Sequence, residues 1–170
     1  EEVALLLFDI DQFKDVNDIH GHVAGDALLQ AVAVRISYLL EADASLARLG
    51  GDEFAIFLHG QGDPLKAHAL ASHVLEAFRK PFLLGGLVLE PTVSIGIAVA
   101  PAHGRDAEEL LASADFALHR AKLCGGNACR LFDPTMRAEA AARRKTREAL
   151  RLAFKNGELT GDFIAVVRFQ

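Results

Sequence analysis

An apolar run closed at once by acidic residues constrains the fold of this chain more than any other feature. Residues 3–8 carry no polar side chain, and Asp9-Ile10-Asp11 follows directly. A continuous apolar run of this length is typical of a strand that is buried on both faces. The sequence therefore predicts a central strand whose carboxylates emerge at its C-terminal end.

A Gly-Gly pair between a short run and an apolar run predicts a β-hairpin. The runs cover residues 45–49 and 54–58, and Gly50-Gly51 lies between them. Asp52 and Glu53 follow the glycines and belong to the hairpin tip. Sequential strands are usually neighbours in a sheet, so we expect this hairpin beside the first strand, where three or four carboxylates would converge on one edge.

The rest of the chain alternates between helical and strand patterns. Periodic apolar residues predict helices over 23–40 and 64–80, and a third helix opens with a capping box at Asp106 and Glu109. A small hairpin is expected over 83–89, and strands over 92–99 and 128–132. This order predicts an α/β sandwich, a mixed central sheet flanked by helices. We interpret residues 134–155, rich in Ala and Arg, as a helical connector to another domain.

Length and composition exclude several classes of protein. The 170 residues suffice for one domain, or one domain and part of a neighbour, and the net charge of −5 disfavours a broad nucleic-acid surface. No apolar run reaches the roughly 18 residues that span a bilayer, so we expect no membrane insertion of this segment. Cys124 and Cys129 lack partners for a zinc site, which fits packing roles in a reducing cytosol. Because the chain does not begin with Met, we expect a longer parent protein, which a membrane segment upstream could tether.

The predicted carboxylate cluster favours a divalent cation. Like charges this close repel one another, and a cation compensates them. Oxygen ligands without His or Cys favour Mg²⁺ or Mn²⁺ over zinc, and such an ion typically shares substrate phosphates. A calcium loop of the EF-hand type is disfavoured by Phe13 and Lys14, and no phosphate-cradling P-loop motif occurs.

Several motifs in the same order resemble the GGDEF family of diguanylate cyclases. The stretch 9–29 matches the signature D-x-D-x-F-K-x-x-N-D-x-x-G-H-x-x-G-D-x-x-L at every specified position. Residues 48–54 match the motif that names the family, and 93–98 and 114–127 resemble its late strand, last helix and loop. The resemblance covers about residues 3–133. It implies a nucleotidyl cyclase-like, palm-related sandwich.

The resemblance also implies a role for each matching residue. Asp9, the carbonyl of Ile10 and Asp52 would hold the divalent ions, and Glu53 would be a further ligand or would deprotonate the attacking ribose 3′-hydroxyl. The remaining matches would bind GTP: Asn17 and Asp26 would recognise guanine, Lys14, Lys122 and backbone amides near Phe13 would bind the triphosphate, and Gly50 and Gly51 would let the nucleotide lie close.

Simpler interpretations stay open for five of these motif residues. Lys14 could be a solvated surface lysine, Asn17 a helix or turn cap, and Asp26 an acid at a helix N-terminus. Asp11 could accept hydrogen bonds from backbone amides instead of binding metal. His22 is expected to be a buried hydrogen-bonding residue and no catalyst.

The family resemblance implies that two GTP molecules are joined into cyclic di-GMP with release of pyrophosphate. Each domain would present one GTP, so catalysis would require a homodimer. A second hypothesis is a GTP-binding regulatory module that controls an attached EAL phosphodiesterase domain, and a third is a metal-dependent phosphohydrolase.

Some positions depart from the family pattern. Glu41 and Ala44 stand where the family's feedback element has Arg and Asp, which predicts that product inhibition through that site is absent. His119 and Gly126 replace a usual Tyr and Arg, and the segment that normally precedes the first strand is missing. Residues 147–159 resemble the start of an EAL domain. The expected organisation is therefore a GGDEF domain over 1–133 and, over 134–170, a linker helix with a possible EAL start.

Overall fold

The computed structural model describes residues 2–156 of the chain. Its contacts divide the chain after Arg137 into two compact units. The first unit contains seven strands and four helices, and begins the last helix. The elements are β1 (Val3–Ile10), α1 (Phe13–His20), α2 (His22–Ser37), β2 (Ala44–Gly50), β3 (Glu53–His59), α3 (Pro64–Phe78), β4 (Phe82–Leu84), β5 (Leu87–Leu89), β6 (Val93–Ala100), α4 (Ala107–Leu123), β7 (Cys129–Leu131) and α5 (Pro134–Lys155).

A five-stranded mixed sheet with the order β2-β3-β1-β6-β7 forms the centre of the first unit. The strand β1 pairs antiparallel with both β3 and β6, while β6 pairs parallel with β7. The predicted neighbours are therefore confirmed, because the Gly-Gly hairpin β2–β3 lies directly beside β1. The strands β4 and β5 form a separate two-stranded hairpin.

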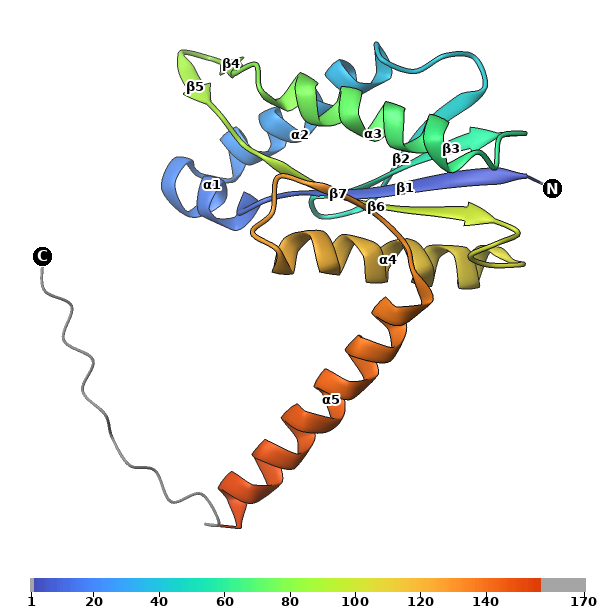
Figure 1. The fold of residues 1–170 in the computed structure, drawn as a ribbon. Helices are drawn as coiled ribbons and strands as arrows, with labels where there is room; N and C mark the ends of the chain where they lie inside the picture. The colour runs from blue at the N-terminus through green and yellow to red at the C-terminus, as the bar shows by residue number, and fades with distance from the viewer. Residues whose placement is uncertain (1, 157–170) are drawn as a thin grey trace, which may run out of the picture. The chain divides into compact units, whose positions relative to one another are not determined.

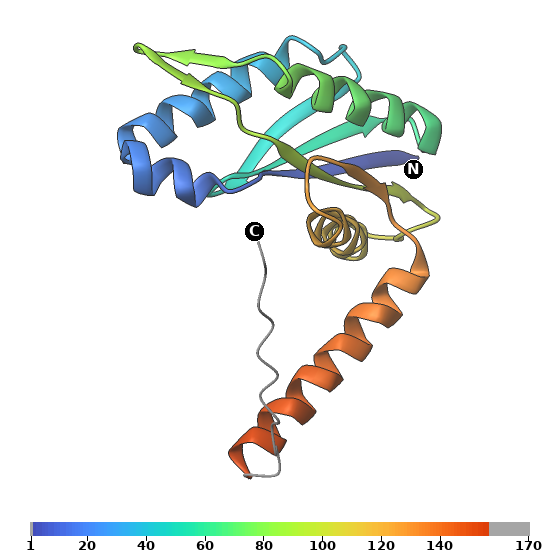
Figure 2. The same cartoon turned by 60° about the vertical axis from the view of Figure 1, so that its left-hand side comes forward.

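Helices cover both faces of this sheet, as Figures 1 and 2 show. The helices α2 and α3 lie on one face, and α4 lies on the other. Side chains alternate along β1, so Leu6 and Phe8 are in the core on the α2/α3 face while Leu5 and Leu7 are in the core against α4. The α/β sandwich that the sequence predicts is confirmed.

The α4 face is packed much more closely than the other. Its buried residues include Ala55, Ala98, Ala114, Ala117 and Ala121, which have small side chains. A Cβ atom on Gly96 of β6 would overlap the main chain of Ala114 and Leu118 in α4. The glycine therefore allows the helix to approach the strand closely.

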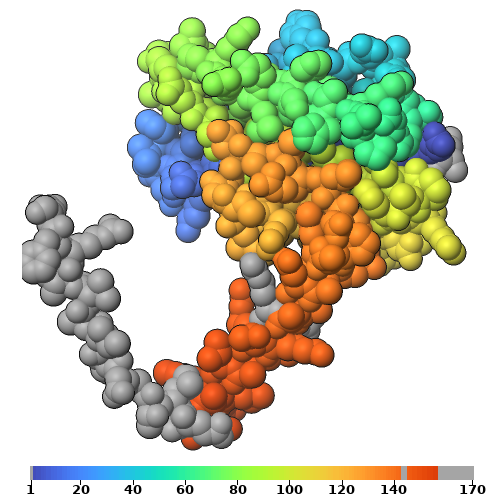
Figure 3. Space-filling model, in the orientation of Figure 1, coloured from blue at the N-terminus to red at the C-terminus, as the bar shows by residue number. Residues whose placement is uncertain are grey.

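On the opposite face, a polar contact near the helix ends joins α2 to α3. Arg35 of α2 donates to the carbonyl of Ala77 at 3.0 Å, and its guanidinium lies 3.4 Å from the ring centroid of Phe82. On the surface in Figure 3, α3 (green) lies next to the segment around β7 (orange). Cys129 of β7 is half-buried there, with its Sγ 3.6 Å from His68 Nε2, whereas Cys124 is exposed and does not pack as expected.

The second unit comprises the chain from Ala138, and the structure describes it as helix through Lys155. A helix over 134–155 is confirmed. Among residues 2–156, none of the helices combines the length and the apolar character that crossing a bilayer requires. The tail residues 157–170, which carry part of the EAL resemblance, lie outside the described residues.

Candidate functional site

The end of β1 brings acidic and hydroxyl side chains together on the α4 face. Side-chain alternation places Asp9 on this face, and the strand register sets it directly opposite Glu53 of β3 and Ser94 of β6. Cross-strand neighbours in such a ladder have their Cβ atoms about 5 Å apart. The sequence predicted that carboxylates of the first strand and of the hairpin come together at one edge. This is confirmed for Asp9 and Glu53.

Asp9 is a buried carboxylate with a cationic partner. Its relative exposure is 7%, and Lys122 Nζ, which comes from the last turn of α4, lies 2.7 Å from its Oδ2. Burial raises the pKa of Asp9, Lys122 lowers it, and the charges of Asp52 and Glu53 raise it again; the net pKa direction is upward. The Asp9 carboxylate therefore lies in a field of two further negative charges.

The acidic residues do not form a complete metal site by themselves. Within residues 2–156, no group of three or more His, Cys, Asp or Glu side chains is arranged to hold a metal ion. The donor set of Asp9, Asp52 and Glu53 nevertheless fits Mg²⁺ or Mn²⁺, because all its donors are oxygens and its charges require a cation. Such an ion would need further oxygen ligands from a substrate, as phosphates provide.

The tip of the β2–β3 hairpin is held by Arg48. Its Nε and Nη2 donate to the carbonyl oxygen of Gly51 at 2.9 and 2.7 Å, and the strand register shifts between Arg48 and Gly50. Gly51 has φ +55°, a conformation that residues with a Cβ adopt rarely. This turn leaves both glycines exposed, and Asp52, which follows them, is close enough for its charge to raise the pKa of Asp9 at the end of β1.

Asp11, at the end of β1, is hydrogen-bonded to β6, to the residue before it and to the α4–β7 loop. Its Oδ2 accepts from Thr92 Oγ1 at 2.7 Å and from the Asn127 amide at 2.9 Å, and its Oδ1 accepts from Ser94 Oγ at 2.6 Å. The sequence left open whether Asp11 binds metal or accepts hydrogen bonds. The structure favours hydrogen bonding, because Asp11 accepts from two hydroxyls and one backbone amide. The carboxylate thereby ties the α4–β7 loop to β1 and β6.

The residues expected to bind nucleotide lie on α1, on α2, at the tip of the β2–β3 hairpin and, for Lys122, in the last turn of α4. Asn17 lies over the buried Gly25, since a Cβ at that glycine would overlap its side-chain oxygen, and Asp26 beside it is exposed. Lys14 is exposed, and Gln12 provides no side-chain cap for the amides at the start of α1 near Phe13. The guanine and phosphate roles of these residues stay predictions.

Two expectations need correction or addition. His22 is exposed at the first position of α2, so its expected role as a buried hydrogen-bonding residue is wrong. The Ile10 side chain is fully buried on the α2/α3 face, so only its main chain could serve the site. Sequence reasoning missed Ser94 and Thr92, although a buried Ser inside the apolar strand Val93–Ala100 is itself a signal of a polar partner.

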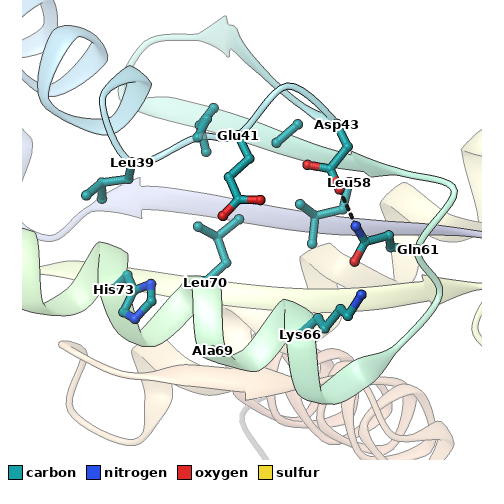
Figure 4. Close-up of a pocket in the computed structure, with 11 residues that line it drawn as sticks. Leu39, Glu41, Asp43, Leu58, Gln61, Lys66, Ala69, Leu70 and His73 are labelled. Carbon is teal, nitrogen blue, oxygen red and sulfur yellow. Dashed lines mark hydrogen bonds between the residues drawn. The ribbon is translucent and has the colours of Figure 1, made fainter.

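A separate cavity of about 290 Å³ lies at the other end of β3, between the α2–β2 loop and α3 (Figure 4). Glu41 and Ala44, which occupy the positions of the family's feedback element, both line it. Figure 4 shows the Glu41 carboxylate directed toward Leu70 of α3, while Asp43 accepts a hydrogen bond from Gln61. The cavity thus presents a carboxylate where the family element has an arginine.

Comparisons with known proteins identify the family of the chain. A family model described as "Diguanylate cyclase, GGDEF domain" matches residues 1–128. The chain is 40% identical over 160 residues to an uncharacterized signaling protein of Caulobacter vibrioides, which covers 94% of this chain and 20% of that protein. It is 36% identical over 156 residues to the bifunctional diguanylate cyclase/cyclic di-GMP phosphodiesterase MucR of Pseudomonas aeruginosa, covering 92% of this chain and 23% of MucR.

Solved structures show the same fold. A structure comprising only the GGDEF domain of TpbB (also called YfiN) from Pseudomonas aeruginosa superposes with a TM-score of 0.80 at 34% identity, covering 83% of each chain. The five-stranded sheet with its flanking helices is thus a palm-like cyclase fold. The chain belongs to the GGDEF family of diguanylate cyclases. It spans about a fifth of the length of the first curated relatives that it matches.

Proposed function

We propose that this domain condenses two GTP molecules into cyclic di-GMP and pyrophosphate, as one half of a homodimer with one GTP on each copy. The observation that carries this proposal is the buried Asp9, set opposite Glu53 on the β1–β3 ladder and within the field of Asp52. Family membership supports the reaction class. The all-oxygen donor set supports a substrate that brings phosphates.

Asp9, Asp52 and the carbonyl of Ile10 would hold Mg²⁺ or Mn²⁺, with Glu53 as a further ligand or as the base. When bound, such an ion would stabilise the negative charge that develops on the phosphoryl oxygens during in-line displacement. Glu53 is exposed at the hairpin end, where a carboxylate can accept the proton of a ribose 3′-hydroxyl presented by the partner copy.

The remaining residues of the site would position GTP. Asn17 and Asp26 offer an amide and a carboxylate, which together can accept from the N1 and N2 donors of guanine and donate to its N3. Lys14, Lys122 and the uncapped amides at the start of α1 would neutralise the triphosphate. Gly50 and Gly51 leave the hairpin tip free of side chains where the nucleotide would lie.

A second function has one specific observation in its favour. Gly126, which stands at the position of the family's Arg, has φ +73°, and a Cβ there would lie 3.0 Å from Asp11 Oδ2. The loop conformation therefore favours glycine at this position, and without the family's Arg the position offers the triphosphate no cationic side chain. This supports a GTP-binding regulatory domain that controls an attached EAL phosphodiesterase, and the name of MucR joins both activities in one relative. We further infer that the GGDEF domain over 1–133 is followed by a linker helix and an EAL domain, and that the protein acts in the cytoplasm, where GTP is available.

Mass spectrometry of the products separates these functions. The protein in its full natural length is incubated with GTP and Mg²⁺, with Asp52→Ala as the matched inactive variant. We expect cyclic di-GMP and pyrophosphate from the wild type, at a rate that rises faster than protein concentration, and none from the variant. GTP binding without product, together with GTP-dependent hydrolysis of cyclic di-GMP, would instead establish the regulatory function. Release of inorganic phosphate from GTP would contradict both.

A further inference from the structure

The Lys122–Asp9 ion pair joins two residues that the proposed reaction assigns to different partners. Asp9 is assigned to the divalent cation and Lys122 to the triphosphate, yet Lys122 Nζ lies 2.7 Å from Asp9 Oδ2. The side chain of Asp9 is 10% exposed and that of Lys122 is 40% exposed. The ammonium therefore covers a carboxylate oxygen that a metal ion would need.

A divalent cation and the ammonium cannot both sit against Asp9 without mutual repulsion. Two positive charges within about 4 Å repel by more than 1 kcal/mol even in bulk water, and a partly buried site screens them less. The entry of a dication thus favours the departure of the ammonium. Lys122 can leave at small cost, because its stem is flexible and its side chain already reaches solvent.

The backbone next to Lys122 is fixed, so the exchange needs only a side-chain rotation. The Asn127 amide donates to Asp11 Oδ2 at 2.9 Å, and the Gly126 amide donates to the carbonyl of Ala121 at 3.2 Å. The first bond ties the loop after α4 to the end of β1, the second closes the end of α4 itself, and neither involves the ion pair. From that backbone, rotation of the half-exposed side chain can direct the ammonium either toward Asp9 or into solvent.

We propose that Lys122 is a positioning residue that occupies Asp9 as a resident cation until a divalent metal binds, and that its ammonium then moves to the substrate's phosphates. The movement of the ammonium to the phosphates rests on the proposed function, whereas its displacement from Asp9 requires only the metal. In the metal-free protein, Lys122 keeps the buried carboxylate compensated. In the loaded protein, the same charge is available where triphosphate is bound.

Titration with Mn²⁺ alone, in the absence of any nucleotide, tests the exchange on the full chain. Lys122→Met is compared with Lys14→Met, which removes an exposed lysine expected in the same site, for which the described residues 2–156 show no ion pair. We expect Lys122→Met to bind Mn²⁺ about threefold or more tightly than wild type, because the competing ammonium is gone. Lys14→Met should bind Mn²⁺ as wild type does. Equal tightening in both variants, or none in Lys122→Met, would overturn the proposal.

Two measurements guard against a misfolded variant. In the presence of a chelator, Lys122→Met should melt about 2–4 °C below wild type, and Mg²⁺ should restore more of its stability than it adds to wild type. In wild-type protein, the ε-methylene NMR signal of Lys122 should shift as Mg²⁺ is added, while that of Lys14 stays in place. An unmoved Lys122 signal at saturating Mg²⁺ would overturn the exchange whether or not the protein makes cyclic di-GMP.

Discussion

The two faces of the central sheet are built differently, and the difference assigns them different tasks. The α2/α3 face buries bulky residues such as Phe8, Phe54 and Ile97, and its packing resembles an ordinary hydrophobic core. The α4 face combines leucines with four buried alanines, and Gly96 allows its helix to approach the strands closely. This close approach brings Lys122 to Asp9 at the end of β1. The first face mainly supplies stability, and the second mainly positions the chemistry.

The largest expected effect comes from breaking the close approach on the α4 face. In Gly96→Ala the new methyl group overlaps the main chain of Ala114, so we expect a loss of about 3 kcal/mol in the free energy of unfolding. The measurement is urea-induced unfolding followed by circular dichroism. As a control on the other face, Ile97→Val should cost only about 1 kcal/mol and leave metal binding intact. A Gly96→Ala variant as stable as wild type would show that the helix does not need this approach.

A smaller effect is expected from loosening the α4–β7 loop. Asp11→Ala leaves the Thr92 and Ser94 hydroxyls and the Asn127 amide without their acceptor, which should cost about 2 kcal/mol of stability. Asp11→Asn retains one carbonyl acceptor and should cost less. Hydrogen exchange of the Asn127 amide measures the effect locally. Unchanged protection of that amide in Asp11→Ala would show that Asp11 does not hold the α4–β7 loop in place.

The smallest effect concerns pH and the far end of the α4 face. His103 packs edge-on against Phe132, and its Nδ1 accepts from the Val99 amide at 3.1 Å. Burial lowers the pKa of His103, while Asp133 opposes this in part. Because the folded pKa lies below the unfolded value of about 6.5, the unfolded state binds more protons in the window between them. His103 therefore destabilises the fold as the pH falls below about 6.5.

Thermal unfolding between pH 5 and 7.5 measures this dependence. In His103→Asn, whose amide oxygen can accept from the Val99 amide without titrating, we expect a flatter pH profile than in wild type. His119→Asn, which changes an exposed histidine on α4, should keep the wild-type profile. If His103→Asn loses as much stability on acidification as wild type, another group carries the pH dependence.

Local patterns in the sequence were sufficient to predict the sheet and its neighbours. The apolar run 3–8 and the β-branched stretch 92–99 reflect strands that are buried on both faces, and the Gly50-Gly51 turn reflects the hairpin. The helix α1 was not anticipated, because it is only eight residues long and has no buried residue, so too few apolar positions mark it as a helix. Gly21 also ends α1 and begins α2, so the two helical patterns do not join into one long stretch.

The candidate site was only partly predictable for a physical reason. Asp9 and Glu53 could be placed together because neighbouring strands fix their register. The Lys122–Asp9 ion pair joins residues 113 positions apart, and its existence depends on how closely α4 packs on the sheet. That packing is determined by Gly96 and the alanines of α4, whose small size leaves little signal in a sequence pattern. The exposure of His22 was likewise set by the turn at Gly21 rather than by residue type.

Binding of Mg²⁺–GTP tests the central claim most directly, namely that carboxylates from the end of β1 and the hairpin tip share a cation with the nucleotide. Calorimetric titration compares wild type with Asp9→Asn and Asp52→Asn, which keep side-chain size and remove one charge each. We predict that each substitution weakens binding of Mg²⁺–GTP by about tenfold or more, and that wild type binds GTP only weakly without a divalent cation. Wild-type affinity for Mg²⁺–GTP in both variants would contradict the account.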